Sequence, residues 1–126
     1  MTDNGRLVLI AGDDEDIRML VRTTLERAGC EVMAACDGVE ALELARTRMP
    51  DLAVLDVSMP ELDGLEALRR LRANEEIAAV PVLLLSARAQ ETDVECGLEA
   101  GASGYIVKPF SPRELIDRVD ELLSRG

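Results

Sequence analysis

The sequence predicts an α/β domain in which helices cover both faces of one parallel β-sheet. Three observations lead to this fold class: five short apolar runs, helical patterns between those runs, and a length of 126 residues. Each run is apolar throughout instead of alternating with polar residues, which is typical of strands buried on both faces. Repeated strand-then-helix units form right-handed crossovers, so the sheet is expected to be doubly wound.

The five expected strands are built almost entirely from aliphatic residues. Hydrophobic residues make up 48% of the chain but aromatic residues only 2%, so Leu, Val, Ile, Met and Ala must form the core. The strands are expected at residues 7–11, 32–35, 52–55, 82–85 and 105–107. A chain of this length forms one domain. We therefore expect a single domain over residues 1–126, with its core at about 6–124 and no effector domain.

The expected helices carry apolar residues at spacings of three and four positions. The first helix places these residues at Ile17, Leu20, Val21, Thr24, Leu25 and Ala28. Gly29 is placed to end this helix, and residues 65–71 repeat its spacing. The weakest helical pattern lies around 91–99, where only Val94 and Leu98 form an apolar stripe.

The last expected helix has the clearest start signal. Its apolar stripe runs over residues 115–123. Ser111 and Glu114 are spaced as a capping box, and Pro112 occupies the first helical position. These signals place the helix start directly after Ser111.

Composition excludes several classes of function. The chain contains no His, which removes Ser-His-Asp and Cys-His catalysis, most catalytic zinc sites and any role as a phosphohistidine donor. The formal net charge of -11 argues against nucleic acid as a direct ligand and against an anionic membrane surface. Both partners are negatively charged and are bound mainly through Lys and Arg side chains.

The cysteines and the chain start indicate the compartment. Cys30, Cys36 and Cys96 match no zinc or redox spacing and are expected to be small buried or half-buried hydrophobic residues. No signal peptide and no membrane-spanning apolar run is visible in the sequence. The cytoplasm is therefore the expected location.

Charged and polar side chains follow four of the five expected strands. Acidic residues 13–16 come after the first strand, Asp56 after the third, Ser86 after the fourth and Lys108 after the fifth. In open parallel sheets, chemistry takes place at the carboxyl ends of the strands, beside the point where strand order reverses. One edge of the sheet is therefore expected to collect at least three carboxylates, a hydroxyl and an ammonium.

This set of side chains suits a magnesium ion and a phosphoryl group. Converging carboxylates repel one another unless a cation lies between them. Oxygen donors without His or Cys suit Mg²⁺, which takes one or two protein carboxylates and keeps several waters. Lys108 and the ion would neutralise a phosphoryl group, to which Ser86 could donate a hydrogen bond. A carboxylate is also a competent nucleophile toward phosphorus and forms an aspartyl phosphate.

Several of these residues also have a purely structural interpretation. Acidic residues 13–16 would favour the start of the first helix, a role that we assign to Asp16 and Glu15. Asp63 and Gly64 are interpreted as a turn and nothing more.

Five motifs occur in order at the ends of the expected strands. They are Asp13-Asp14-Glu15, Asp56, Met59-Pro60-Glu61-Leu62-Asp63-Gly64, Ser86-Ala87 and Gly101-Ala102-Ser103-Gly104-Tyr105-Ile106-Val107-Lys108-Pro109-Phe110. Together they resemble a receiver domain of two-component response regulators. The resemblance covers about Leu7 to about Leu123. It implies the flavodoxin-like strand order 2-1-3-4-5.

The resemblance also implies a role for each residue of the phosphoryl site. Asp56 would accept the phosphoryl group, and Lys108 would contact its oxygens. Ser86 would shift toward the phosphoryl group on activation, and Tyr105 would rotate inward with it. The Lys108–Pro109 peptide bond is expected to be cis, which X-Pro bonds tolerate most readily.

A metal site follows from the same resemblance. Mg²⁺ (or Mn²⁺) would be bound by the side chains of Asp14 and Asp56, by the backbone carbonyl of Ser58, and by Asp13 through water.

The chain departs from the family pattern at a few positions. Gly12 precedes the acidic pair where many relatives carry an aliphatic residue, so we expect a more flexible end to the first strand. Ser86 replaces the commoner Thr and keeps the hydroxyl. Ser58 and Arg88 lie at positions that vary in the family and tune the lifetime of the phosphorylated state.

The function implied is a phosphorylation-dependent signalling switch. The phosphoryl donor would be a sensor histidine kinase or a histidine phosphotransfer protein, and the output an altered affinity for a downstream protein target. The domain is expected to be a monomer or a phosphorylation-induced dimer. It would catalyse its own phosphorylation and dephosphorylation but turn over no external substrate, and so is not expected to be an enzyme.

Two alternatives from other classes remain open. Asp14-Glu15-Asp16-Ile17 superficially resembles the nucleophile motif of haloacid-dehalogenase-type phosphatases, in which Asp14 would attack the substrate. The domain would otherwise be an interaction module that works unphosphorylated. Flavodoxin-like FMN binding is disfavoured, because the first loop is acidic where a phosphate cradle should be.

Overall fold

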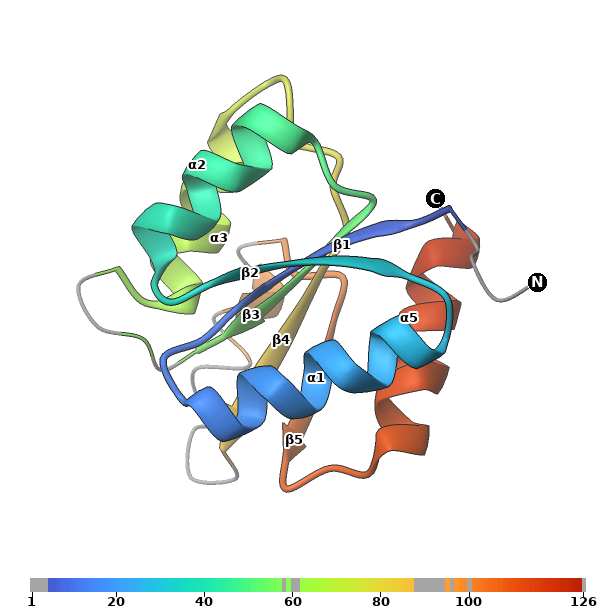
Figure 1. Cartoon of the computed structure of the whole chain (residues 1–126). Coiled ribbons are helices and arrows are strands. Elements are labelled where there is room, and N and C mark those ends of the chain that lie inside the picture. The colour runs from blue at the N-terminus through green and yellow to red at the C-terminus, as the bar shows by residue number, and fades with distance from the viewer. Residues whose placement is uncertain are drawn as a thin grey trace.

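The fold is a single five-stranded parallel sheet with helices on both faces (Figure 1). The computed structural model describes residues 5–57, 59, 62–87, 95, 97–99 and 101–125. The strands are β1 (Leu7–Ala11), β2 (Glu31–Ala35), β3 (Leu52–Asp56), β4 (Val82–Ala87) and β5 (Gly104–Lys108). Their order in the sheet is β2-β1-β3-β4-β5, which confirms the predicted topology.

The register of the strands brings the predicted site residues to one edge. Asp56 is the last residue of β3 and lies opposite Leu85 of β4. Lys108 is the last residue of β5 and lies opposite Ala87, the last residue of β4. These residues therefore end their strands, instead of following them as the sequence pattern predicted. The observed strand ends differ from the predicted ones by at most two residues, so the site still lies at the carboxyl edge of the sheet.

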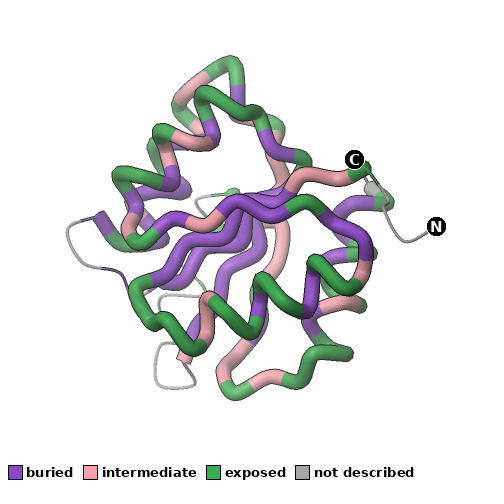
Figure 2. The backbone as a smooth tube through the Cα atoms, in the orientation of Figure 1, coloured by how far each residue is buried: buried purple, intermediate pink, exposed green. Residues whose placement is uncertain are grey.

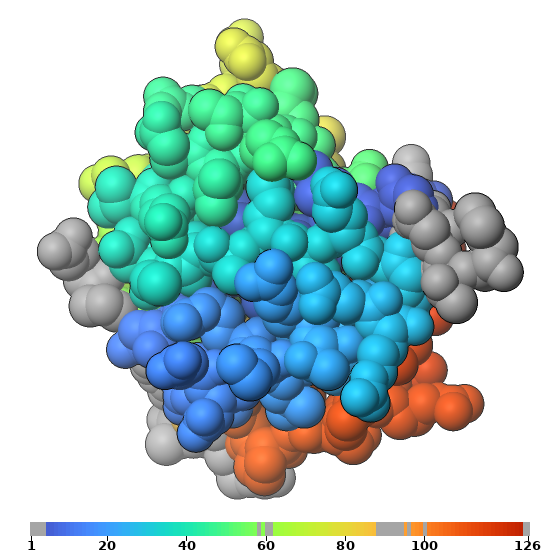
Figure 3. Space-filling model, viewed as in Figure 1, coloured from blue at the N-terminus to red at the C-terminus, as the bar shows by residue number. Residues whose placement is uncertain are grey.

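Four helices have defined bounds: α1 (Glu15–Arg27), α2 (Gly38–Arg48), α3 (Gly64–Ala73) and α5 (Pro112–Arg125). Helices α1 and α5 cover one face of the sheet, and α2 and α3 cover the other (Figure 1). In the space-filling view, α1, β2 and α2 form most of the near surface (Figure 3). Much of the expected helix around 91–99, including Val94, lies outside the described residues, but Glu95 and residues 97–99 are helical.

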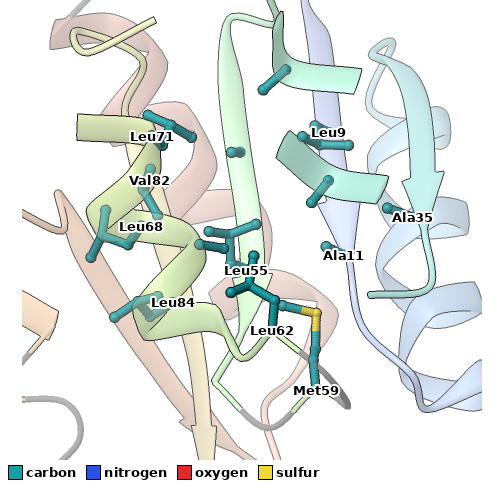
Figure 4. Close-up of a cluster of buried hydrophobic side chains, with 14 of the residues drawn as sticks. Leu9, Ala11, Ala35, Leu55, Met59, Leu62, Leu68, Leu71, Val82 and Leu84 are labelled. Carbon is teal, nitrogen blue, oxygen red and sulfur yellow. The ribbon is translucent and has the colours of Figure 1, made fainter. Parts of the chain in front are cut away.

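The core consists of two apolar clusters, one on each face of the sheet. Alternate strand residues contribute to each: Leu9 and Leu55 pack toward α2 and α3 (Figure 4), whereas Ile10 and Val54 pack toward α1 and α5. The central strands are buried along their length (Figure 2). Burial on both faces is the physical reason that these strands read as continuous apolar runs.

The predicted helix ends are borne out at two places. Gly29 adopts a φ of 97°, and its N–H donates to the carbonyl of Glu26 at 3.0 Å just past the end of α1. At the other end of the chain, the hydroxyl of Ser111 accepts a hydrogen bond from the N–H of Glu114 at 3.1 Å. Both contacts satisfy backbone groups that the helix itself leaves unpaired.

Two residues assigned to apolar stripes are exposed, which corrects the prediction. Leu20 is 37% exposed, because the buried face of α1 is formed by Val21, Thr24 and Leu25. Leu98 is 45% exposed. Here the inward contact is made by Gly97, where a Cβ atom would overlap the side chain of Leu84. A helix that approaches the sheet through a glycine needs no large apolar side chain at that point.

No helix in the part of the chain that the structure describes is long and apolar enough to cross a membrane.

Candidate phosphoryl-acceptor site

Asp56 and Lys108 form the centre of the candidate site. The Nζ of Lys108 donates a hydrogen bond to Oδ2 of Asp56 at 2.9 Å. The side chain of Asp56 is 2% exposed and that of Lys108 is 21% exposed. A carboxylate this deeply buried is costly unless a cation and hydrogen bonds compensate it. The two residues lie 52 positions apart in sequence, and only the parallel topology brings them together.

The turn after β1 packs directly against Asp56. A Cβ atom on Gly12 would lie 3.4 Å from the Cβ of Asp56, so a small residue is accommodated there at ordinary contact distance. The N–H of Gly12 donates to the carbonyl of Ala35 at 3.1 Å, and its carbonyl accepts from Nη1 of Arg18 at 2.8 Å. Both backbone groups of Gly12 are therefore held, in contrast to the looser strand end expected from a glycine.

Asp14 is the N-cap of α1, and Glu15 and Asp16 lie at the start of this helix as expected. Oδ1 of Asp14 accepts from the N–H of Asp16 at 2.9 Å and from the N–H of Ile17 at 3.2 Å. Glu15 and Asp16 lie in the first turn, where a negative charge favours the helix dipole. A cap residue must accept hydrogen bonds from N–H groups two and three residues ahead, and only Asp14 is placed to do so.

The predicted metal ligands are brought to the same edge, but they do not enclose a metal centre. Asp13 and Asp14 are exposed and follow β1, which pairs with β3 and its terminal Asp56. Within the described ranges, no group of three or more His, Cys, Asp or Glu side chains is arranged to hold a metal ion. The donors are nevertheless all carboxylates, which fits Mg²⁺ because it needs only one or two of them besides water. Ser58, the predicted carbonyl ligand, lies outside the described residues, as does Arg88.

The two predicted switch residues lie on neighbouring strands. Ser86 is fully buried, and its hydroxyl donates to the carbonyl of Ala87 at 3.1 Å. Tyr105 lies on β5 and is 38% exposed. The peptide bond between Lys108 and Pro109 is cis, as the resemblance implied.

Asp63 and Gly64 were interpreted from the sequence as a turn only, but the structure gives each of them a further structural role. Asp63 is the N-cap of α3, and its carboxylate accepts from the N–H of Glu66 at 2.9 Å. The spacing of Asp63 and Glu66 is a helix-start signature that could have revealed this. Gly64 packs against the backbone of Asp56, where a Cβ atom would overlap the Asp56 carbonyl oxygen.

A second glycine packs closely against the chain that follows Asp56. Gly38 begins α2, and a Cβ atom there would overlap the carbonyl oxygen of Leu62. The N–H of Gly64 also donates to the carbonyl of Val57 at 3.1 Å. Val57 and Leu62 therefore make close backbone contacts with the starts of α3 and α2 respectively. No sequence signal marks such contacts, because they arise between segments that meet only in the folded chain.

A doubly wound α/β domain with a buried aspartate–lysine pair at the carboxyl edge defines a class of protein, the receiver domains. The comparisons with known proteins agree. The model of the response regulator receiver domain family matches residues 8–120, and the chain belongs to this family. It is therefore a receiver domain of two-component signalling.

Curated relatives and solved structures support this assignment. The chain is 47% identical over 119 residues to the alkaline phosphatase synthesis transcriptional regulatory protein PhoP of Bacillus subtilis, covering 94% of this chain and 49% of that protein. It is 41% identical to the transcriptional regulatory protein GltR of Pseudomonas aeruginosa, covering 100% and 52%. The chain thus spans about half the length of these relatives.

Among solved structures, the receiver domain of the Francisella response regulator 1452 superposes with a TM-score of 0.86 at 42% identity, covering 96% of this chain and 98% of that one. A response regulator structure from Chloroflexus aurantiacus gives a TM-score of 0.91 at 35% identity, covering 94% and 98%. Because the named relatives are transcriptional regulators about twice as long, the expectation that nucleic acid is not a direct ligand concerns these 126 residues alone.

Proposed function

We propose that the domain is a switch operated by phosphorylation of Asp56. The observation that carries the proposal is the buried Asp56 carboxylate in contact with the Lys108 ammonium. A carboxylate oxygen of Asp56 would attack the phosphorus of a phosphohistidine on a sensor histidine kinase or phosphotransfer protein. A P–O bond forms, the P–N bond breaks, and the imidazole leaves with the electron pair and takes a proton from solvent.

The residues around Asp56 have distinct roles in this transfer. Lys108, whose Nζ already contacts the acceptor carboxylate, would stabilise the negative charge on the phosphoryl oxygens. Ser86 would turn its hydroxyl away from the Ala87 carbonyl toward the phosphoryl group. Tyr105, which is exposed on the adjacent strand, would rotate inward when Ser86 moves. This rotation would alter the surface that a downstream protein contacts.

A divalent cation completes the proposal. Asp13, Asp14 and Asp56 would hold Mg²⁺ (or Mn²⁺), with the backbone carbonyl of Ser58 as a further ligand. When bound, the ion supplies positive charge that orients and neutralises the phosphoryl oxygens. Asp14 accepts both hydrogen bonds of the α1 cap through Oδ1. The cap requires an oxygen acceptor, whereas metal binding requires the carboxylate charge, so the two roles can be separated by substitution.

The contacts of the two candidate nucleophiles favour a switch over a phosphatase that uses Asp14. The Asp56 carboxylate accepts a hydrogen bond from Nζ of Lys108, whereas Oδ1 of Asp14 accepts two hydrogen bonds as the cap of α1. A cytoplasmic location is part of the proposal.

The proposal is tested by incubating the protein with acetyl phosphate and Mg²⁺ and measuring its intact mass. We expect the wild type to gain one phosphoryl group and Asp56→Asn to gain none. Asp37→Asn is the matched control, because Asp37 caps α2 and Asn caps a helix equally well. Phosphorylation of Asp56→Asn at the wild-type level would refute the assignment.

Two further experiments separate the alternatives. A phosphatase that uses Asp14 would hydrolyse para-nitrophenyl phosphate steadily, and Asp14→Asn but not Asp56→Asn would abolish this turnover. A phosphorylation-independent module would bind a downstream partner equally with and without beryllofluoride. We expect neither result.

A further inference from the structure

Arg72 makes an unusual set of contacts at the end of the sheet opposite to Asp56. It lies near the end of α3, and its guanidinium donates four hydrogen bonds to three backbone carbonyls. Nε and Nη2 both donate to Gly101, at 2.9 and 2.8 Å. Nη1 donates to Ala78 at 2.9 Å and to Val80 at 2.6 Å. One side chain thus joins α3 to two separate connecting segments.

These segments lead directly into β4 and β5. Val80 lies two residues before the start of β4, and Gly101 lies three residues before the start of β5. Ser103 adds to the same junction: its N–H donates to the Val82 carbonyl at 2.9 Å, and its hydroxyl accepts from the Val82 N–H at 3.1 Å. The starting ends of the two strands are therefore tied together and to α3.

Gly101 is shaped to receive the arginine. Its φ is +106°, and a Cβ atom there would lie 3.0 Å from Nε and 3.3 Å from Cδ of Arg72. A side chain at position 101 would therefore press against the guanidinium that binds its carbonyl. Glycine allows both the backbone conformation and the close approach.

The chemistry of the contact suits arginine alone. A guanidinium presents five donors in a rigid planar fork, whereas a lysine ammonium presents three donors at one point. Burial lowers the pKa of the Arg72 guanidinium by desolvation. An arginine still stays protonated at neutral pH after such a shift, so the hydrogen bonds keep their charge-assisted strength.

We propose that Arg72 is a positioning residue that fixes the register of β5 on β4 and thereby places Lys108 against Asp56. Lys108 pairs with Ala87 across β4 and β5, and β4 separates β5 from β3, which carries Asp56. A shift of β5 along β4 moves Lys108 by the same amount, and a shift of one residue turns its side chain to the opposite face. Only the consequence for phosphoryl transfer rests on the proposed function; the register itself does not.

The test compares Arg72→Lys and Arg72→Gln with Arg70→Gln. Arg70 lies on the same helix and makes an exposed ion pair with Glu66 at 3.2 Å. Arg70→Gln therefore removes the same charge from α3 as Arg72→Gln does. Two quantities are measured without any phosphoryl donor: amide hydrogen exchange along β5, and the NMR signals of the Lys108 Cε methylene. These readouts report register and pairing even if phosphorylation of Asp56 proves wrong.

We expect both Arg72 variants to accelerate amide exchange at Tyr105–Val107 by about tenfold or more, because each lost charge-assisted hydrogen bond corresponds to about that factor. The Lys108 signals should move toward those of an unpaired lysine, more in Arg72→Gln than in Arg72→Lys. Arg70→Gln should match the wild type in both measurements. If Arg72→Gln does not fold, Arg72→Lys decides the outcome.

Unchanged Lys108 signals in a folded Arg72→Lys protein would overturn the proposal, even if thermal stability fell, because a merely structural role predicts only the loss of stability. Equal effects of Arg72→Lys and Arg70→Gln would overturn it as well.

Discussion

The Nζ of Lys108 and the Oδ2 of Asp56 lie 2.9 Å apart, although their strands are separated in the sheet by β4. The lysine side chain crosses the end of β4 to reach the acid. The contact compensates the charge of a carboxylate that is 2% exposed. It therefore serves stability as well as the proposed chemistry, and the two roles can be measured separately.

Lys108→Met should destabilise the domain. The variant keeps the aliphatic stem but leaves the buried carboxylate of Asp56 without its ammonium. We expect the free energy of unfolding to fall by about 1–3 kcal/mol, less than for a fully buried pair because the lysine is partly solvated. Urea unfolding at neutral pH measures the change.

The double variant Asp56→Asn/Lys108→Met isolates the pairing energy. Its loss of stability should be smaller than the sum of the two single losses, since both charges leave together. Arg113→Met is the control, because it breaks an exposed ion pair to Asp117 whose side chains are 85% and 66% exposed. Such pairs contribute little. Strict additivity of the two single variants would show that the contact between Asp56 and Lys108 contributes no coupling.

Gly64→Ala should disturb the backbone of Asp56. The added methyl group would overlap the Asp56 carbonyl oxygen and approach Cα of Val57, and these backbone atoms leave little room for adjustment. Overpacking of this kind costs about 1–3 kcal/mol. Thermal unfolding measures the loss, and acetyl phosphate labelling measures the effect on the acceptor.

Gly104→Ala provides the comparison for that experiment. A Cβ atom there would lie 3.6 Å from Cδ1 of Leu83 and 3.8 Å from Cδ1 of Leu122, which is ordinary van der Waals contact. This variant should retain most of the stability and the wild-type rate of labelling. A Gly64→Ala protein as stable and as reactive as Gly104→Ala would contradict the close packing described for Asp56.

Asp14 combines a helix cap with a proposed metal ligand, and two substitutions separate the roles. Asp14→Asn keeps an oxygen that accepts from the N–H groups of Asp16 and Ile17, so stability should be nearly unchanged. Asp14→Ala removes the cap and should cost about 1 kcal/mol. Both should weaken Mg²⁺ binding, measured by isothermal titration calorimetry, because both remove the carboxylate charge.

Metal binding that survives in Asp14→Asn would show that Asp14 acts only as a cap. Asp37→Asn is again the appropriate control, since it changes the charge of a helix cap that is not among the proposed metal ligands. It should bind Mg²⁺ as the wild type does.

The sheet and the location of the site were predictable because their signals are local or topological. Strands buried on both faces must be apolar throughout, so runs such as 52–55 are visible without a structure. The carboxyl edge of a parallel sheet then determines where Asp56 and Lys108 meet. The exact last residues of these strands were not predictable, since the polar ends of β3 and β5 break the apolar pattern before the ladder ends.

Contacts between backbone and distant segments were not predictable. Gly64 against Asp56, Gly38 against Leu62 and Arg72 against Gly101 all depend on how closely two segments approach after folding. Gly64 looks like any turn glycine in the sequence, and Arg72 looks like any surface arginine on a helix. The cap role of Asp14 was not predictable for a related reason: four consecutive acidic residues cannot be divided between cap and first turn until the backbone conformation is known.

The role of Asp56 as phosphoryl acceptor is tested by an NMR titration of the wild type and Asp56→Asn with Mg²⁺ and beryllofluoride, which mimics a phosphoryl group on a carboxylate. For the wild type, we predict slow-exchange shifts centred on Asp56, Ser86, Tyr105 and Lys108, and no such shifts for Asp56→Asn. A wild-type spectrum that beryllofluoride leaves unchanged in the presence of Mg²⁺, or an equal response in Asp56→Asn, would show that Asp56 is not the phosphoryl acceptor.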